Sequence, residues 1–379
     1  MPVEFEEYQA KKIVNIHKHA DNWFWDKYSA HPYVGCAYGC SFCYARGGKY
    51  AGRSDPLLYD RVIRVKTNAT QLLRKELTKL EPDVLACGDW QQPAEGRYRL
   101  SRTMLEVVLE MNFPLLVLER SPEVLHDLDL LSEIHHQSHT CVAFSFCSVD
   151  EGLKRAFEPR SPGTAQRLNA MKILAKAGIQ VGMLLIPILP LVGDDERHLE
   201  DAVLAARDHG AQFVLAGGLT MQGLQANMTL EVFRRFAPEK EADLRALYHW
   251  QADGEPRYSP PTTYFKPLYM RVREYCLRHG LKHRIPRYIP PTPLGINREV
   301  AEMLLNRVFD LELSSESPHA VWAYRKAAWT VDEMRESIAE LVDREGKCGL
   351  RELPHIGGKI AKDIASFIMQ NRGVIQNIP

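Results

Sequence analysis

Residues 31–46 read HPYVGCAYGCSFCYAR and contain three cysteines, Cys36, Cys40 and Cys43, in the spacing C-x3-C-x2-C. Thiolates this close in sequence can converge on one small group. Iron–sulfur clusters are held by cysteine thiolates, and zinc is the usual alternative for clustered cysteines. A structural zinc site takes four ligands, and the sequence offers no second C-x2-C pair and only His31 as a weak fourth ligand. The pattern therefore favours an iron–sulfur cluster in which one iron lacks a protein ligand, with zinc as the alternative.

This spacing, with the aromatic Phe42 directly before the third cysteine, resembles the signature of radical S-adenosylmethionine (SAM) enzymes. The resemblance implies a [4Fe-4S] cluster whose open iron binds the amino and carboxylate groups of SAM. An electron from that cluster would cleave SAM to methionine and a 5′-deoxyadenosyl radical. Phe42 would lie against the adenine, and Tyr44 would either relay a radical or simply pack.

The bulk composition limits the remaining possibilities. A length of 379 residues predicts two or three domains, and 45% hydrophobic residues allow a large core. The 48 basic and 48 acidic residues give a formal charge of +0, so any nucleic-acid contact must come from a local patch. Eight cysteines behind an acidic, polar N-terminus without a secretory pattern predict a reducing cytoplasm. Apolar runs fall short of the roughly 18 residues of a membrane span, so we expect no membrane association.

Between about residues 31 and 218, short apolar runs alternate with helical patterns. The repeated strand–helix–strand order predicts a parallel sheet with right-handed crossovers. Six strands are fewer than the eight of a closed barrel. We therefore predict an α/β fold, an open (βα)6 partial barrel as the radical SAM resemblance implies, with a small all-α C-terminal domain. The predicted strands are 31–35, 84–87, 115–119, 141–147, 180–187 and 212–216, and the predicted helices are 67–80, 102–111, 123–136, 164–177 and 196–209.

The other parts of the chain divide by composition. Residues 1–30 form an N-terminal lead-in, and residues 219–313 form a barrel extension that could bind substrate. Within that extension, a basic stretch at 271–287 is interleaved with aromatic residues. It could follow a nucleic-acid backbone and stack bases, or form a solvated helix face over core aromatics. After a polar break at 314–318, residues 314–379 predict a separate small helical domain.

In that domain, residues 350–368 read LRELPHIGGKIAKDIASFI and resemble the helix–hairpin–helix motif of DNA-processing proteins. Gly357 and Gly358 let the turn approach a phosphate closely, and a helix N-terminus favours an anion. Lys359 and Lys362 add positive charge, and contacts of this kind ignore base sequence. The alternative is a tight turn in a protein-interaction bundle.

Several motifs between about residues 30 and 200 resemble the spore photoproduct lyase-like branch of the radical SAM proteins. Residues 88–95, GDWQQPAE, look like that branch's Asp-Pro-Tyr-Gln-Pro-x-Glu, although Trp90 and Gln91 depart from its Pro-Tyr pair. Residues 157–162, FEPRSP, and 186–190, IPILP, resemble its Glu-Pro-Arg-x-Pro and Pro-x-x-Pro motifs.

This resemblance implies roles at the ends of the predicted strands. Asp89 stands where the SAM amino group is usually held, and Arg120 stands in place of a family lysine that binds the SAM carboxylate. An arginine can bind a carboxylate bidentately. Ser145 and Ser148 would touch the ribose or simply form turns. Arg160 would reach SAM or a substrate phosphate, or form an ion pair with Glu158.

Cys87 is the candidate for a thiol that returns a hydrogen atom to a product radical, as a cysteine outside the cluster loop does in spore photoproduct lyases. Its place at the end of the second predicted strand should make it face the site. The alternative is a small buried hydrophobic residue, which is how most free cysteines behave. Cys141, Cys147, Cys276 and Cys348 are expected to be core residues.

The sequence therefore predicts a cytoplasmic radical SAM enzyme that acts on nucleic acid, most simply in DNA lesion repair or base modification. A flipped base or a single strand would have to enter the barrel. An electron donor such as flavodoxin or ferredoxin is an implied partner. The alternatives are an RNA-modifying radical SAM enzyme, a radical SAM enzyme on a small molecule or peptide with the helical domain as a docking module, and a non-enzymatic iron–sulfur protein that binds nucleic acid.

Overall fold

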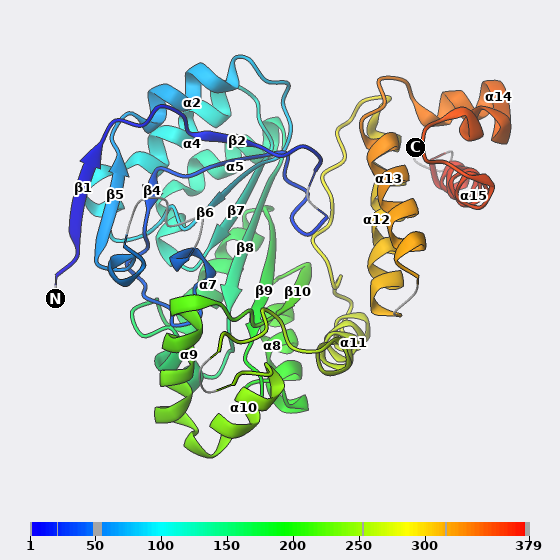
Figure 1. Cartoon of the computed structure of the whole chain (residues 1–379). Coiled ribbons are helices and arrows are strands. Elements are labelled where there is room, and N and C mark those ends of the chain that lie inside the picture. Colours follow the sequence, from blue (N-terminus) through cyan, green and yellow to red (C-terminus); the bar gives the residue numbers. More distant parts are fainter. Residues whose placement is uncertain (1, 21, 48–54, 252–253, 315–316, 376–379) are drawn as a thin grey trace. The chain divides into compact units, whose positions relative to one another are not determined.

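The computed structural model describes residues 2–20, 22–47, 55–251, 254–314 and 317–375. The chain forms two compact units. The first comprises Met1–Lys18 and Asp26–Pro286, and the second comprises His19–Trp25 and Arg287–Pro379. The first unit holds the sheets of the structure, and the second is helical (Figure 1).

The first unit is built on a sheet in the order β10-β9-β8-β7-β6-β3-β2. All neighbouring strands from β3 to β10 are parallel, and β2 runs antiparallel at the edge. The predicted parallel α/β sheet is confirmed, with six parallel strands among the described residues. The strands are β2 (Val14–Ile16), β3 (Tyr28–Ala30), β6 (Leu85–Gly88), β7 (Leu115–Glu119), β8 (Thr140–Phe146), β9 (Gln180–Ile188) and β10 (Phe213–Gly218).

The first strand differs from the prediction. β3 pairs with β6, whereas residues 33–34 form β4 (Tyr33–Val34) in a separate small sheet ordered β1-β5-β4. The other members of this sheet are β1 (Glu4–Tyr8) and β5 (Val62–Lys66). The predicted strand at 31–35 was therefore wrong for the main sheet, because the chain leaves that sheet after Ala30. The lead-in at 1–30 supplies strands to both sheets.

Helices follow the strands of the main sheet where periodicity predicted them. α8 shows the local reason: the Asp195 side chain caps the helix by accepting from the His198 N–H at 2.9 Å. Its residues Leu199, Ala202 and Val203 recur at helical spacing and are fully buried. The helices between strands are α2 (Ala69–Leu77), α3 (Glu95–Tyr98), α4 (Leu100–Glu110), α5 (Leu128–Gln137), α6 (Glu151–Phe157), α7 (Thr164–Lys176) and α8 (Glu196–Asp208).

The register of the sheet identifies its helix-covered face. Thr140 Oγ1 donates to the Leu131 carbonyl of α5 at 3.1 Å, and the guanidinium of Arg167 in α7 lies 4.8 Å from the ring centre of Phe146. Since side chains alternate along a strand, the even-numbered residues of β8 face the helices. Ser145 and the other odd-numbered residues of β8 face the opposite side.

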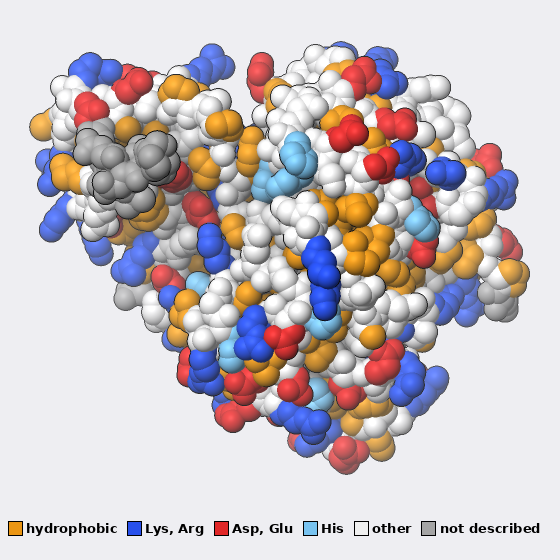
Figure 2. All heavy atoms as spheres, turned by 180° about the vertical axis from the view of Figure 1, so that it is seen from behind, with side chains coloured by type: hydrophobic (Ala, Val, Ile, Leu, Met, Phe, Trp, Pro, Cys, Tyr) orange, Lys and Arg blue, Asp and Glu red, His pale blue; other side chains and the backbone are white. Residues whose placement is uncertain are grey.

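Residues 219–286 continue the first unit as helices α9 (Gly223–Phe236), α10 (Glu241–Leu247) and α11 (Thr262–Arg278). The basic stretch at 271–287 does not form a free cationic strip. Arg271 and Arg278 lie 3.9 and 3.4 Å from glutamates of α8, and Arg284 is 7% exposed. Acidic and basic side chains are likewise interspersed on the face shown in Figure 2. These contacts favour the solvated helix face over a nucleic-acid track.

The second unit contains α12 (Gly295–Leu313), α13 (Pro318–Asp332), α14 (Ile338–Glu352) and α15 (Gly358–Ile375). It is larger than the predicted domain at 314–379, because it begins at Arg287 and includes α12. The segment His19–Trp25 joins it, and His19 stacks on Trp329 at 4.1 Å with an interplanar angle of 7°. None of the helices in the described residues combines the length and apolar character that crossing a bilayer requires.

Candidate active site

The three cysteines lie in one loop that follows β4. All three thiols are free; Cys36 and Cys40 are buried, and Cys43 is partly exposed. Gly35, with φ +99°, starts the loop where a Cβ would lie 2.7 Å from the Tyr59 carbonyl oxygen, so the backbone there requires glycine. Burial is the main cause that raises the pKa of each thiol, to about 12 for Cys40, and neighbouring thiols add to the rise at Cys36 and Cys40. The raised pKa values favour protonated thiols. A bound cation would favour the thiolates instead, because the thiolate is the form that binds metal.

Hydrogen bonds fix this loop along its length. They come from a turn before β5, the turn after β6, the end of α6 and helix α9, so four separate parts of the first unit shape one loop. The pairs are Cys36 N–H to Tyr59 O (3.1 Å), Tyr38 OH to Gln91 O (2.6 Å), Ser41 N–H to Phe157 O (2.9 Å), Thr229 Oγ1 to Ser41 O (3.1 Å) and Gln225 Nε2 to Phe42 O (3.2 Å).

The residues of the loop fit an iron–sulfur cluster. Ser41 is 4% exposed, and its Oγ has no hydrogen-bond partner among the described residues, which is costly for a buried hydroxyl unless another group completes the site. Within those residues, no three His, Cys, Asp or Glu side chains gather closely enough to share one metal ion. A zinc ion needs its ligands at one point, whereas the cysteines of a cubane cluster each bind a different iron. Cys36, Cys40 and Cys43 would hold such a cluster.

Two carboxyl groups stand at the ends of β6 and β7, the partly exposed Asp89 and the buried Glu119. Asp89 has φ +52°, a left-handed conformation that interrupts the alternation of the strand. Its charge raises the pKa of all three loop cysteines. Glu119, which the sequence analysis did not select, is fully buried and accepts the Gln91 N–H at 3.0 Å and the Arg120 N–H at 3.3 Å. Burial, followed by the Asp89 charge, raises the pKa of Glu119 to about 8.

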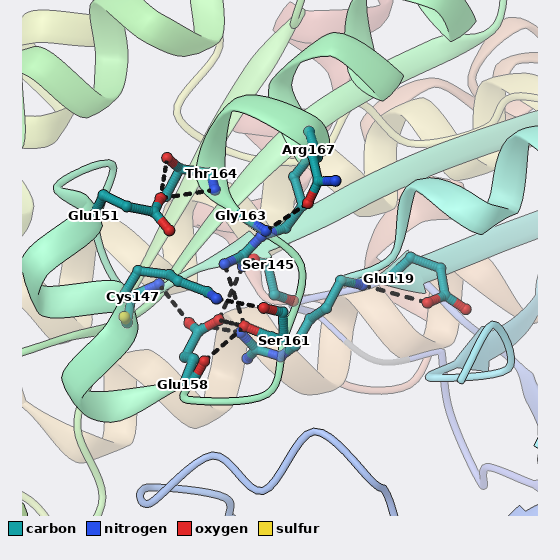
Figure 3. A network of polar contacts seen from close by, with 12 residues as sticks. Glu119, Ser145, Cys147, Glu151, Glu158, Ser161, Gly163, Thr164 and Arg167 are labelled. Carbon is teal, nitrogen blue, oxygen red and sulfur yellow. Dashed lines mark hydrogen bonds and ion pairs between the residues drawn. The ribbon is translucent and has the colours of Figure 1, made fainter. Parts of the chain in front are cut away.

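A buried ion-pair network centres on Glu158 (Figure 3). Its carboxylate lies 2.9 Å from Arg120 Nη1 and 3.0 Å from Arg167 Nη1. The Cys147 N–H and Ser161 Oγ donate to the same carboxylate at 3.2 and 2.9 Å. Burial opposes the charge of Glu158, but the two arginines outweigh it and lower its pKa to about 2. Arg167 lies in α7, directly after the FEPRSP motif; the sequence motif includes it, but no role was predicted for it.

Two predicted SAM contacts are brought together. The Arg120 guanidinium lies 5.6 Å from the ring centre of Phe42, which belongs to the cysteine loop. The arginine side chain is 14% exposed and paired with Glu158, so it is held in one place rather than free to swing. Arg120 and Phe42 therefore lie together at the cysteine loop.

The other predicted contacts separate into different environments. Ser145 lies on the sheet face away from α5 and α7, and its carbonyl accepts from Arg167 at 2.7 Å. Ser148 Oγ accepts the Asp150 N–H at 3.0 Å, which is a turn-forming role. Arg160 pairs with Asp60 and not with Glu158, so that expected ion pair was wrong. Tyr44 is 55% exposed and does not pack in the core.

Cys87 does not face the site as expected. Cys87 pairs in register with Val117 of β7, and Val117 pairs with Val142 of β8, so the three side chains share one face. Val142 lies two residues from Thr140, which faces the helices. Alternation therefore turns the Cys87 thiol toward the helices, where it is 1% exposed. Of the four cysteines expected in the core, Cys141, Cys147 and Cys276 are buried, whereas Cys348 is exposed and that expectation was wrong. Cys147 packs in the same apolar core cluster as Cys36, Cys40 and Phe42.

In the helical unit, the hairpin residues lie at the start of α15. Gly357, Gly358, Lys359 and Lys362 are exposed, and His355 in the turn has φ +65°. Lys359 also lines a cavity of about 900 Å³ between α12, α13 and α15. Four carboxylates share that lining, which disfavours a phosphate beside Lys359: Glu299, Glu302, Asp310 and Asp363.

Comparison with known proteins supports the fold. No protein-family model matches the chain. An uncharacterized protein of Mycobacterium tuberculosis is 28% identical over 261 residues, 67% of this chain and 75% of that protein. An uncharacterized protein of Methanocaldococcus jannaschii is 28% identical over 201 residues, 51% of this chain and 71% of that protein.

Among solved structures, a spore photoproduct lyase mutant with bound AdoMet and dinucleoside spore photoproduct superposes with a TM-score of 0.53 at 18% identity. The match covers 73% of this chain and 81% of that one. Spore photoproduct lyase complexed with dinucleoside spore photoproduct gives a TM-score of 0.52 with the same identity and coverage. The first unit therefore has the partial-barrel fold of that radical SAM enzyme.

Proposed function

We propose that this protein is a radical SAM enzyme that holds a [4Fe-4S] cluster in the loop of Cys36, Cys40 and Cys43. The observation that carries the proposal is three free thiols in one loop, two of them buried, whose Phe42 ring lies 5.6 Å from the Arg120 guanidinium, within the fold of spore photoproduct lyase. When bound, a cluster with one open iron supplies the electron that cleaves SAM and generates a carbon radical.

The residues around the loop would bind and orient SAM. Asp89 directly follows β6 and would offer a carboxylate to the SAM amino group, and its charge raises the pKa of all three loop thiols. Arg120 offers a guanidinium to the SAM carboxylate, fixed in direction by its 2.9 Å pair with Glu158. Phe42 presents an aromatic ring for the adenine, and Ser145 lies on the sheet face where a ribose would sit. The buried surroundings would exclude water from the radical.

The proposed substrate is nucleic acid, most simply damaged DNA. The spore photoproduct lyase structures contain a dinucleoside lesion, and the motifs between residues 30 and 200 resemble that branch. The exposed hairpin of Gly357, Gly358 and Lys362 offers backbone N–H groups and a cation to a phosphate. An electron donor of the flavodoxin or ferredoxin type belongs to the same proposal, as does a cytoplasmic location.

A second candidate has one observation in its favour. The carboxylate-lined cavity beside Lys359 suits a cationic protein segment better than a phosphate backbone. The helical unit would then dock a partner, and the barrel would act on a small molecule or peptide.

The two candidates are separated by supplying substrates to the reconstituted, reduced protein with SAM under anaerobic conditions. Ultraviolet-damaged DNA, undamaged DNA and RNA are compared, and altered nucleosides and 5′-deoxyadenosine are quantified. The proposal expects product with damaged DNA alone. SAM cleavage that ignores all three nucleic acids would favour the docking candidate.

A further inference from the structure

Asp60 joins two arginines from different segments, one at the end of the cysteine loop and one in the turn after α6. Its Oδ1 is 2.8 Å from Nη1 of Arg46, and its Oδ2 pairs with Nη2 of Arg160. Arg46 lies in the short helix η1 (Tyr44–Arg46) that ends the loop, whereas Arg160 belongs to the turn after α6. We propose that Asp60 is a positioning residue that clasps Arg46 and Arg160 and so holds the cysteine loop in its cluster-binding shape.

The contacts place this clasp at both ends of the loop. The Cys36 N–H donates to the carbonyl of Tyr59, and Arg46 reaches the side chain of the next residue, Asp60. The consecutive residues Tyr59 and Asp60 thus bind the first cysteine of the loop and its last turn, respectively. The Arg46 N–H bonds the Cys43 carbonyl at 3.2 Å, so a displaced Arg46 would pull on the third cysteine directly.

Arg160 closes the clasp over the middle of the loop. A Cβ at Gly39, which has φ +65°, would lie 2.9 Å from the Arg160 Cζ. Only a glycine leaves room for the guanidinium to pass beside the backbone there. Gly39 directly precedes Cys40, so Arg160 presses on the segment that presents the second cysteine.

The charge and burial of the two arginines explain why the carboxylate of Asp60 is needed between them. Arg46 is 1% exposed, and its Nε has no partner among the described residues, so the ion pair with Asp60 compensates its buried charge. Asp60 is 14% exposed and Arg160 is 40% exposed. Removal of the carboxylate would leave two neighbouring cations without their shared counter-charge, with one of them buried.

The first test uses cluster-free protein and does not depend on the proposed function. Backbone hydrogen–deuterium exchange is compared for wild type, Asp60→Asn and the control Asp55→Asn. Asp55 is an exposed acid whose side chain accepts the Leu57 N–H at 2.9 Å. We expect Asp60→Asn to exchange at least about tenfold faster at residues 36–46 alone, the order of a lost charge-assisted hydrogen bond. Unchanged exchange there, or a uniform rise across the first unit, would overturn the clasp.

The second test links the clasp to the cluster, and therefore rests on the proposed function. After anaerobic reconstitution, the rate of iron loss to a chelator is measured for wild type, Asp60→Asn, Arg160→Ala and the double variant. Both single variants should lose iron faster, and the double variant should be no worse than the more severe single one, because they break one shared contact. Arg160→Lys should restore part of the retention. Additive effects would contradict a shared clasp, whereas a wild type that takes up no iron would count against the cluster and leave the exchange result standing.

Discussion

Arg120 and Glu158 lie 38 positions apart in the chain and form a buried ion pair, with 2.9 Å between Nη1 and Oε1. Glu158 also pairs with the fully buried Arg167, so the two oxygens of one carboxylate each hold an arginine. This arrangement ties the end of β7 to the turn after α6. It directs Arg120 toward the ring of Phe42 in the cysteine loop.

Replacement of Glu158 by Gln should destabilise the first unit. The change leaves Arg167 buried without a counter-charge, and breaking a buried pair in this way costs about 3–5 kcal/mol. The free energy of unfolding of cluster-free protein in urea measures the effect. Glu110→Gln is the matched control, because its pair with Arg74 is exposed and should contribute little. Equal stability of the two variants would contradict the role given to Glu158.

The same carboxylate predicts an acid-dependent loss of stability. The pKa of Glu158 is lowered from 4.5 in the unfolded chain to about 2 in the folded one. Its contribution is therefore complete above pH 4.5 and is lost as the pH falls toward 2, with a total of about 3 kcal/mol. Urea unfolding of cluster-free protein between pH 5 and pH 3 should show this decline in wild type. The decline should be shallower in Glu158→Gln, and parallel curves would exclude Glu158 as its source.

The parallel sheet and the cysteine loop could be predicted because their signals are local. Helical periodicity predicted helices such as the one at 196–209, which is α8 in the structure. The spacing of Cys36, Cys40 and Cys43 is likewise a short-range pattern. Long-range partners had no such signal. Asp60 looks like an ordinary surface acid in sequence, and its two arginines come from distant segments. The face of Cys87 depends on register across three strands, which strand length alone does not give.

Cys87→Ala should therefore leave the cluster and the fate of the product radical unchanged. The thiol faces the helices and is buried, so its loss removes only a small apolar contact. Deuterium incorporation into product from D2O solvent, which exchanges into thiols, checks whether a thiol still returns hydrogen. Loss of that incorporation in Cys87→Ala would show that the thiol reaches the site. Cys147→Ala serves as the comparison, because Cys147 packs in the same apolar cluster as two of the loop cysteines.

The two hairpin lysines should differ in their effect on DNA binding. Lys359 lines a cavity with four carboxylates, whereas Lys362 does not line it and is exposed one turn further along α15. Lys362→Ala should weaken binding more and reduce the salt slope by about one counterion. Fluorescence anisotropy with duplex DNA at several salt concentrations measures both. If neither variant changes affinity, the hairpin does not bind the backbone, and the docking candidate gains support.

SAM cleavage by the reconstituted protein tests the central claim most directly. Wild type and Cys40→Ala are loaded with iron and sulfide anaerobically, reduced with dithionite and given SAM. The account predicts a [4Fe-4S] electron paramagnetic resonance signal that changes on SAM addition, together with 5′-deoxyadenosine from wild type and none from Cys40→Ala. A fully loaded wild-type cluster whose signal ignores SAM and which forms no 5′-deoxyadenosine would contradict it, and would leave an iron–sulfur protein without this chemistry.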